Sequence, residues 1–171
     1  NYLVKNRHTS PLEAMVFTFE VQAPIFVLRQ WMRHRTWSYN EVSARYTEMP
    51  ELFFVPNRLL KQSKDNKQMS LPERVDGEKE LISDMITANR YAFVTYHNLL
   101  AKGVSRELAR TVLPVSTYSR MFCTVDLHNL LHFLELRLAP HSQPEIQVYA
   151  EAILKLIEPI VPEVIKAWKS K

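Results

Sequence analysis

The chain has 171 residues, of which 46% are hydrophobic and 11% aromatic, the composition of an ordered globular protein rather than of a disordered one. Lysine and arginine outnumber aspartate and glutamate by 22 to 18, a mild excess that suits a polyanionic ligand but does not require one. The lone Cys123 excludes an intrachain disulfide framework, and no apolar run reaches the roughly 18 residues of a membrane span, so we expect a cytoplasmic protein without membrane contact.

The first segments predict a strand followed by a helix. Residues 15–21 alternate apolar and polar side chains and are rich in β-branched and aromatic residues, which is typical of a strand. Pro24 suits the first turn of a helix, where its missing N–H costs no hydrogen bond. We expect this helix to run through 25–34, with Arg29 and Arg33 four residues apart on an exposed face.

The middle of the chain predicts one long helix between less regular segments. Residues 51–56 predict a short strand that ends at proline, and the polar stretch 61–77 predicts an exposed loop. Over 78–102 apolar residues recur at spacings of three and four, the pattern of a long amphipathic helix. Gly103 ends this helix, and a shorter helix is expected over 106–113.

The last third of the chain predicts a strand over 116–125, a helix over 127–137 and a final helix with an apolar stripe over 146–157, which two prolines then interrupt. Strands and helices do not alternate as βαβ units would. We therefore predict an α+β fold, a single domain over 1–171 with a small antiparallel or mixed sheet and several long helices. These helices need more apolar partner surface than one small sheet offers, which predicts an oligomer. Because the chain begins at Asn1 rather than Met, we also expect an N-terminal segment to be missing.

The chain has only two glycines, Gly77 and Gly103. Phosphate-binding loops of the Walker or dinucleotide type need several glycines so that the backbone can approach the phosphate. Both loop types are therefore excluded, and any phosphate must be bound by side chains, for which arginine has the best geometry.

Arginine is concentrated in the stretch RQWMRHRTWSYNEVSARY, residues 29–46, which holds four arginines and a histidine. A solvated helix end is the simplest explanation for such a charged cluster. Two features favour recognition of a phosphate or carboxylate instead. Arginine rather than lysine makes up the cluster, and hydrogen-bonding side chains follow at Ser38, Asn40, Glu41 and Ser43.

This stretch carries the pattern RHRxxSxNExSxRY and thereby resembles the flavin-dependent thymidylate synthases. The resemblance extends through HTSPLEAMVFTFEVQAPIFVLRQW before the motif and VSRELARTVLP, LLHFLELR and HSQPEIQ after it. It implies a homotetramer whose active sites are assembled from several subunits. It also implies an enzyme that binds FAD, takes a hydride from NADPH and transfers a one-carbon unit from methylenetetrahydrofolate to dUMP, giving dTMP.

The resemblance also implies roles for individual residues. Arg137 resembles the arginine that contacts the uracil ring, and we expect it to be catalytic because a cation beside the ring stabilises the negative charge that develops there. The expected dUMP-binding residues are Gln30, Glu41, Ser43, Arg45, Arg110 and Arg137. The expected FAD-binding residues are His8, Ser10, Arg33, His34, Arg35, Thr36, Asp126, His128, His132 and His141.

The chain departs from the family pattern at Ala14, Asp126, His128 and Pro144, and it has only seven residues before His8. Two other kinds of function stay open on the sequence alone. One is a nucleic-acid-binding module in which the RHR cluster binds phosphates and Trp31, Trp37 and Tyr39 stack on bases. The other is a family relative that has lost turnover and acts as an interaction protein.

Two further sets of residues suggest chemistry that we do not expect. His128 and His132 are four apart on a predicted helix and could ligate zinc, but no third ligand follows at a familiar spacing, so no metal site is expected. Cys123 is the obvious candidate for a nucleophile attacking uracil. It lies in a predicted strand with no histidine or helix N-terminus adjacent in sequence to lower its pKa, so we expect a packing residue.

Overall fold

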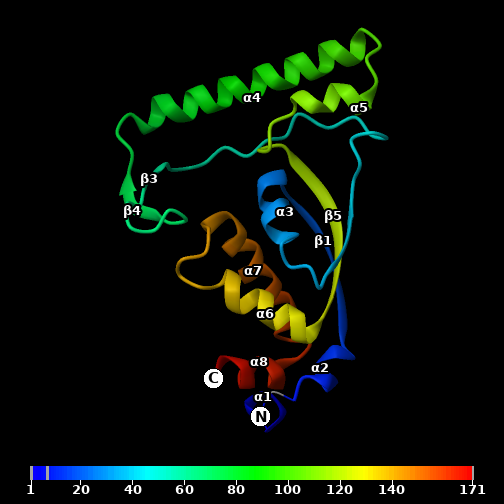
Figure 1. The fold of residues 1–171 in the computed structure, drawn as a ribbon, viewed down its shortest axis with the longest axis vertical. Coiled ribbons are helices and arrows are strands. Elements are labelled where there is room, and N and C mark those ends of the chain that lie inside the picture. Colours follow the sequence, from blue (N-terminus) through cyan, green and yellow to red (C-terminus); the bar gives the residue numbers. More distant parts are fainter. Residues whose placement is uncertain (1, 7, 171) are drawn as a thin grey trace. The chain divides into compact units, whose positions relative to one another are not determined.

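The structure is a computed structural model and describes residues 2–6 and 8–170 (Figure 1). The helices are α1 (Tyr2–Lys5), α2 (Ser10–Glu13), α3 (Ile25–Trp31), α4 (Glu78–Ala101), α5 (Arg106–Ala109), the 3₁₀ turn η1 (Arg110–Val112), α6 (Leu127–Arg137), α7 (Pro144–Ile157) and α8 (Pro162–Lys169). The strands are β1 (Val16–Pro24), β2 (Ser38–Glu41), β3 (Leu60–Gln62), β4 (Ser70–Arg74) and β5 (Tyr118–Asp126). They form two small sheets, one in the order β1-β5-β2 and one antiparallel β3-β4 pair, so the predicted α+β class is confirmed.

The chain divides into two compact units. The first unit comprises Asn1–Glu20, Arg29–Asn40 and Phe122–Lys171, and the second comprises Val21–Leu28 and Glu41–Met121. Strands β1 and β5 each contribute residues to both units. Neither unit is therefore a consecutive stretch of sequence.

In the first unit, helices α6 and α7 pack against each other, α2 packs on α6, and α1 packs on α8 (Figure 1). Asp126 caps the N-terminus of helix α6: its carboxylate accepts hydrogen bonds from the backbone N–H of Asn129 at 2.9 Å and from the side-chain amide of Asn129 at 2.6 Å. Apolar residues three or four apart then face the interior of the unit; on α6 and α7 they include Leu127, Leu130, Leu134, Ile146, Ala150, Ile153 and Ile157.

An aromatic cluster lies where α6 meets the turn after α3. The Trp31 ring stacks on Phe133 with centroids 4.8 Å apart, and Trp37 meets Trp31 edge-on at 5.7 Å. Trp31 is completely buried and Trp37 is 6% exposed. Such pairs contribute roughly 0.5–1.5 kcal/mol each beyond their buried area, so this cluster fixes the C-terminal end of α3 against α6.

The second unit is built around the 24-residue helix α4. Both glycines have positive φ, 70° at Gly77 before the helix and 82° at Gly103 after it, a conformation that residues with a Cβ rarely adopt. On one side of α4, Phe93 and Tyr96 are completely buried, and the Tyr96 hydroxyl accepts a hydrogen bond from the Met49 backbone N–H at 3.1 Å. This hydrogen bond attaches the segment after the arginine-rich stretch to the helix.

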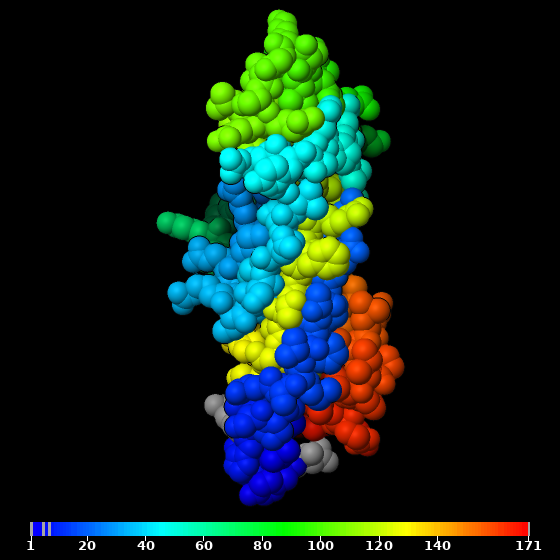
Figure 2. Space-filling view, turned by 90° about the vertical axis from the view of Figure 1, so that its right-hand side faces the viewer, coloured from blue at the N-terminus to red at the C-terminus, as the bar shows by residue number. Residues whose placement is uncertain are grey.

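Strands β1 and β5 present alternate side chains to opposite faces, as their period of two requires. On β5 the buried positions include Met121, Cys123 and Val125. On the other face the hydroxyls of Thr18 and Thr124 lie 2.9 Å apart, across the two strands. Figure 2 shows residues of β1 in blue beside residues of β5 in yellow.

The structure corrects the prediction of strand 51–56 and of loop 61–77. The first segment forms a single antiparallel bridge, from Phe53 to Thr117. The two prolines that flank it, at 50 and 56, cannot donate to a ladder. The predicted loop instead contains the β3-β4 hairpin, in which the Gln62 side-chain amide donates to backbone carbonyls of the turn, including that of Met69 at 3.0 Å. Because polar side chains stabilise this turn, the segment has no periodic pattern of apolar residues from which the hairpin could be predicted.

Helix α3 ends at Trp31, so the predicted extension to residue 34 is wrong. The backbone N–H of His34 donates to the carbonyl of Trp31, three residues back, at 2.9 Å, which tightens the chain into a turn. The Tyr39 hydroxyl lies 3.0 Å from the Trp31 carbonyl oxygen and 2.8 Å from that of His34 and shares its proton between them. Arg33 therefore lies in the turn and not on a helix face with Arg29. Strand β2 and helix α8 were not predicted.

Candidate functional site

The first unit brings together two of the predicted site residues, His34 and Arg137. Arg137 lies in the last turn of α6, where the helix dipole favours a cation, and His34 lies in the turn after α3. The Arg137 Nε–H donates a hydrogen bond of 2.9 Å to Nε2 of His34. Within the described part of the chain, the two terminal nitrogens of Arg137 have no hydrogen-bond partner. They remain available to a ligand.

His34 is neutral at physiological pH. Burial, and after it the charges of Arg137 and His132, lower the pKa of its imidazole from 6.5 to about 4. Because Nε2 accepts the hydrogen bond from Arg137, the ring proton must lie on Nδ1. Burial also lowers the pKa of Arg137, but a guanidinium stays protonated in proteins. In this pair, Arg137 therefore carries a full positive charge and His34, which accepts its hydrogen bond, is uncharged.

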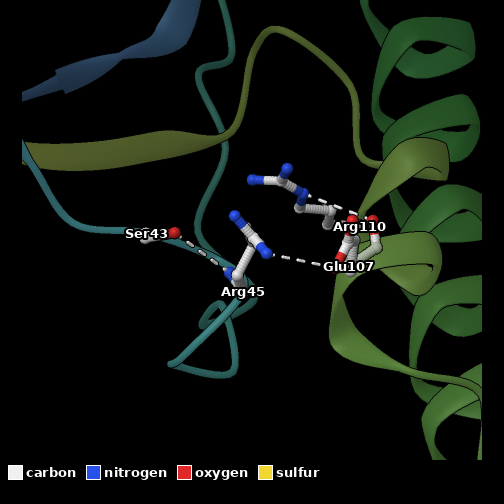
Figure 3. Close-up of polar contacts among 4 residues, drawn as sticks. All are labelled: Ser43, Arg45, Glu107 and Arg110. Atoms are coloured by element: carbon white, nitrogen blue, oxygen red, sulfur yellow. Dashed lines mark hydrogen bonds and ion pairs between the residues drawn. The ribbon is translucent and has the colours of Figure 1, made fainter.

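The second unit brings together three other predicted residues, Ser43, Arg45 and Arg110, around Glu107 (Figure 3). Arg45 Nη2 lies 3.3 Å from a carboxylate oxygen of Glu107, and Arg110 Nε donates to the Glu107 backbone carbonyl at 3.3 Å. The Ser43 hydroxyl accepts from the Arg45 backbone N–H at 3.3 Å. The Arg45 and Glu107 side chains are 50% and 61% exposed, so this ion pair is open to solvent and weak.

The remaining dUMP-binding candidates lie apart from these groups in the chain. Gln30 is on α3 in the first unit and half-buried, and its Oε1 is buried with no hydrogen-bond partner among the residues that the structure describes. Glu41 is exposed at the end of β2 and belongs to the second unit. Each unit thus carries its own share of the predicted dUMP residues.

Most of the predicted FAD-binding residues are exposed on the first unit. Arg33, Arg35 and Thr36 are exposed in the turn between α3 and β2, as are His8, Ser10, His132 and His141 elsewhere in the unit. His128 is half-buried on α6, and both carboxylate oxygens of Asp126 accept hydrogen bonds from Asn129, one from its backbone N–H and one from its side-chain amide. The Nε2 atom of the His34 ring already accepts a hydrogen bond from Arg137. These flavin roles stay predictions.

Two of the three aromatic residues on which the nucleic-acid alternative depended, Trp31 and Trp37, are buried, whereas Tyr39 is half-buried. Trp31 and Trp37 are packed in the aromatic cluster and present no ring face on which a base could stack. Cys123 is completely buried, and burial raises the pKa of its thiol to about 12, so it is no thiolate at neutral pH. Among the described residues, no three His, Cys, Asp or Glu side chains gather where they could hold a metal ion, and no helix is long and apolar enough to cross a membrane.

Three residues that shape these groups, Glu107, Phe133 and Tyr39, were not predicted from the sequence as site residues. Glu107 is three residues before Arg110 in RELAR. This spacing places both near one face of a helix, so their proximity could have been predicted from the sequence. Phe133 is four residues before Arg137, so its position beside Arg137 on α6 could likewise have been predicted. The cap that Tyr39 provides to the turn holding His34 has no signal in the sequence.

Comparison with known proteins decides the family. The model of the Thy1 family, described as thymidylate synthase complementing protein, matches residues 1–163. The chain belongs to the Thy1 family. The resemblance read from the RHR motif is thereby confirmed.

Similar Thy1 proteins include flavin-dependent thymidylate synthases from three distant organisms. That of Thermus thermophilus is 49% identical over 162 residues, or 95% of this chain and 59% of the relative. Those of Treponema denticola and Dictyostelium discoideum are 45% and 44% identical over 95% and 98% of this chain, and 62% and 56% of their own lengths. The chain thus spans about six tenths of the length of these relatives.

The Thy1 chain is also similar to solved structures of a UMP/dUMP methylase, PolB, from Streptomyces cacaoi. The structure bound with 5-Br dUMP aligns with a TM-score of 0.90 at 39% identity and covers 99% of this chain and 76% of the other. The structure bound with 5-Br UMP gives a TM-score of 0.87 at 41% identity and covers 98% and 81%. Both were determined with a brominated uridine nucleotide.

Proposed function

We propose that this protein is an FAD-dependent thymidylate synthase, which methylates dUMP to dTMP with methylenetetrahydrofolate as the one-carbon donor and NADPH as the reductant. The observation that carries the proposal is the solvent-exposed arginine pair of Arg45 and Arg110 beside the Ser43 hydroxyl; Ser43 and Arg45 lie in the RHRxxSxNExSxRY stretch and Arg110 lies in RELAR. The relatives named as flavin-dependent thymidylate synthases support it, as does the binding of 5-Br dUMP by the similar methylase.

The arginine pair suits the phosphate of dUMP. A phosphate monoester carries nearly two negative charges at neutral pH, and guanidinium groups bind its oxygens through charge-assisted hydrogen bonds. Arg45 already holds a carboxylate, that of Glu107, at 3.3 Å. The weak, exposed ion pair is easily exchanged for a doubly charged phosphate, and the Ser43 hydroxyl supplies one more donor.

Arg137 suits the uracil ring. The ring must become electron-rich at its fifth carbon before it can attack a one-carbon electrophile, and the negative charge develops on the neighbouring carbonyl and ring nitrogen. The free terminal nitrogens of Arg137 can donate to those atoms and stabilise this charge. No enzyme thiol is needed for this activation, in keeping with the buried, protonated Cys123.

The donor set of the first unit fits FAD. Arg33 and Arg35 are exposed cations in one turn, and among the described residues neither has an ion-pair partner, so they suit the flavin's pyrophosphate. When bound, the flavin supplies the hydride that completes the methyl group. The chain's contribution is to bind and orient, with Thr36 and the exposed His8 and His141 as further hydrogen-bonding groups.

Several finer points of the proposal remain predictions from the sequence. They are the folate donor, the choice of NADPH, the homotetramer with shared active sites and the cytoplasmic location. The runner-up is a family relative without turnover. Formation of dTMP from dUMP by the purified protein separates the two.

The phosphate role is tested by Arg45→Ala and Arg110→Ala. Each change removes one guanidinium from a doubly charged ligand, so dUMP affinity measured by calorimetry should fall by about 2 kcal/mol or more, while the flavin spectrum of the protein is unchanged. Arg106→Ala, which removes an exposed arginine from the same short helix as Glu107, is the matched control and should bind dUMP normally. Unchanged dUMP binding in both test variants would contradict the assignment.

A further inference from the structure

We propose that His34 is a positioning residue for Arg137: its neutral imidazole holds the guanidinium through Nε, so that the terminal nitrogens face the ligand with their charge undiminished. The inference rests on the proposed function of Arg137. It goes beyond that function because it assigns to His34 a role through another side chain, whereas the family resemblance assigns His34 only to the flavin.

His34 is itself fixed on several sides. Its backbone N–H donates to the Trp31 carbonyl at 2.9 Å, and its own carbonyl accepts from the Tyr39 hydroxyl at 2.8 Å and from the Trp37 backbone N–H at 3.4 Å. Its ring stands edge-on to Phe133 with centroids 4.9 Å apart. Only 9% of the residue is exposed. A side chain with so little freedom can set the position of its hydrogen-bond partner.

One face of α6 provides both contacts to the imidazole. Phe133 and Arg137 are four residues apart on this helix, so their side chains lie one above the other. The Phe133 ring packs edge-on to the imidazole and orients it, while the imidazole Nε2 accepts the hydrogen bond that the Arg137 Nε–H donates. Since an arginine side chain carries about 2 kcal/mol of rotamer entropy, an anchor at Nε reduces the ordering that the ligand would otherwise have to impose.

The chemical nature of the anchor matters as much as its position. Buried arginines are usually paired with carboxylates, and a carboxylate would neutralise the charge that Arg137 must present to an electron-rich ring. A neutral imidazole accepts the hydrogen bond without cancelling the charge. Protonated histidine would have no lone pair for Nε–H and would repel the guanidinium. The burial that keeps His34 neutral is therefore part of the arrangement.

Three substitutions separate position from charge. His34→Gln keeps a neutral acceptor near the position of Nε2, His34→Glu supplies a charged acceptor, and His34→Leu supplies none. We expect His34→Gln to keep kcat within a few-fold of wild type. His34→Leu and His34→Glu should each lower kcat on the order of 10- to 100-fold, with smaller changes in dUMP affinity, because one loses the anchor and the other the uncompensated charge. Flavin absorbance and calorimetry report FAD and dUMP binding separately.

A second measurement tests the hydrogen bond without any turnover. In ring-nitrogen NMR of the FAD-loaded protein, His34 should show a protonated Nδ1 and an unprotonated, hydrogen-bonded Nε2 at neutral pH. Arg137→Lys removes the Nε–H donor and should shift the Nε2 signal, whereas Arg106→Lys should not. This readout remains available if His34→Leu fails to fold.

Each outcome decides the question. Equal kcat for His34→Gln and His34→Leu, or full activity of His34→Glu, overturns the positioning role. A doubly protonated His34 ring, or an Nε2 signal indifferent to Arg137→Lys, overturns the hydrogen bond itself. A wild-type protein that binds FAD and dUMP but makes no dTMP overturns the proposed function, and with it the catalytic role of the pair, whether or not the NMR signals show the hydrogen bond.

Discussion

The low pKa of His34 predicts that this residue makes the protein less stable in acid. In the folded protein the imidazole has a pKa of about 4, against 6.5 for an unperturbed histidine. Between these two values the unfolded chain binds a proton that the folded protein does not, so the free energy of unfolding falls as the pH decreases through this window. Linkage with these two pKa values gives a loss of about 2 kcal/mol between pH 7 and pH 4.5. His34→Gln has no titrating group and should lack this loss.

Urea unfolding of wild type and His34→Gln at both pH values, at one protein concentration, measures the difference. The free energies of unfolding should fall less steeply in the variant, by about 2 kcal/mol over the interval. His141→Gln, which removes an exposed histidine of the same unit, serves as control and should follow wild type. Parallel profiles for wild type and His34→Gln would refute the reasoning, because they would mean that His34 titrates alike in both states.

Three other predictions concern the remaining groups. Glu107→Gln removes the carboxylate that competes for Arg45, and since exposed pairs contribute about 0.2–1 kcal/mol, dUMP affinity by calorimetry should rise up to about fivefold; a fall would show that Glu107 helps to bind the nucleotide. Cys123→Ala should cost on the order of 1 kcal/mol in urea unfolding and leave dTMP formation intact; loss of all dTMP formation in the folded, FAD-loaded variant would make Cys123 a nucleophile after all. Asp126→Ala should lower the free energy of unfolding by about 1 kcal/mol through the lost helix cap, while Asp126→Asn, which can still cap, should not.

The long helices were predictable because their boundaries and periodicity are local. The helix expected over 127–137 has the observed bounds, and the one expected over 78–102 differs by one residue, because Gly103 follows it and a clear apolar stripe runs along it. Elements whose stability comes from other parts of the chain were not predictable. Strand β2 is short and polar, and only its place beside β5 makes it a strand.

In the candidate site, too, residues within one motif were predictable from the sequence, whereas contacts between residues far apart in the chain were not. Short sequence motifs predicted the candidate arginines: Arg33, Arg35 and Arg45 lie in the RHRxxSxNExSxRY stretch, Arg110 in RELAR and Arg137 in LELR. The hydrogen bond between His34 and Arg137 joins residues 103 apart in sequence and depends on how the turn after α3 meets α6. His34 was predicted from RHR and Arg137 from LELR, and neither motif indicates that the two side chains contact each other. The ion pair between Arg45 and Glu107 was not predictable from the sequence either, because the two residues are 62 positions apart.

The single thiol, Cys123, allows the separation of strands β1 and β5 to be measured by chemical labelling. Cys123 lies on β5, the middle strand of its sheet, and its sulfur contacts the carbonyl of Phe19 on β1 at 3.7 Å. A thiol reagent in solution can reach it only after the two strands separate, and its high pKa suppresses reaction until that happens. The labelling rate therefore measures how often the sheet opens. With no second cysteine in the sequence, that rate needs no correction for a background site, and its response to FAD or dUMP would report how far each ligand closes the sheet.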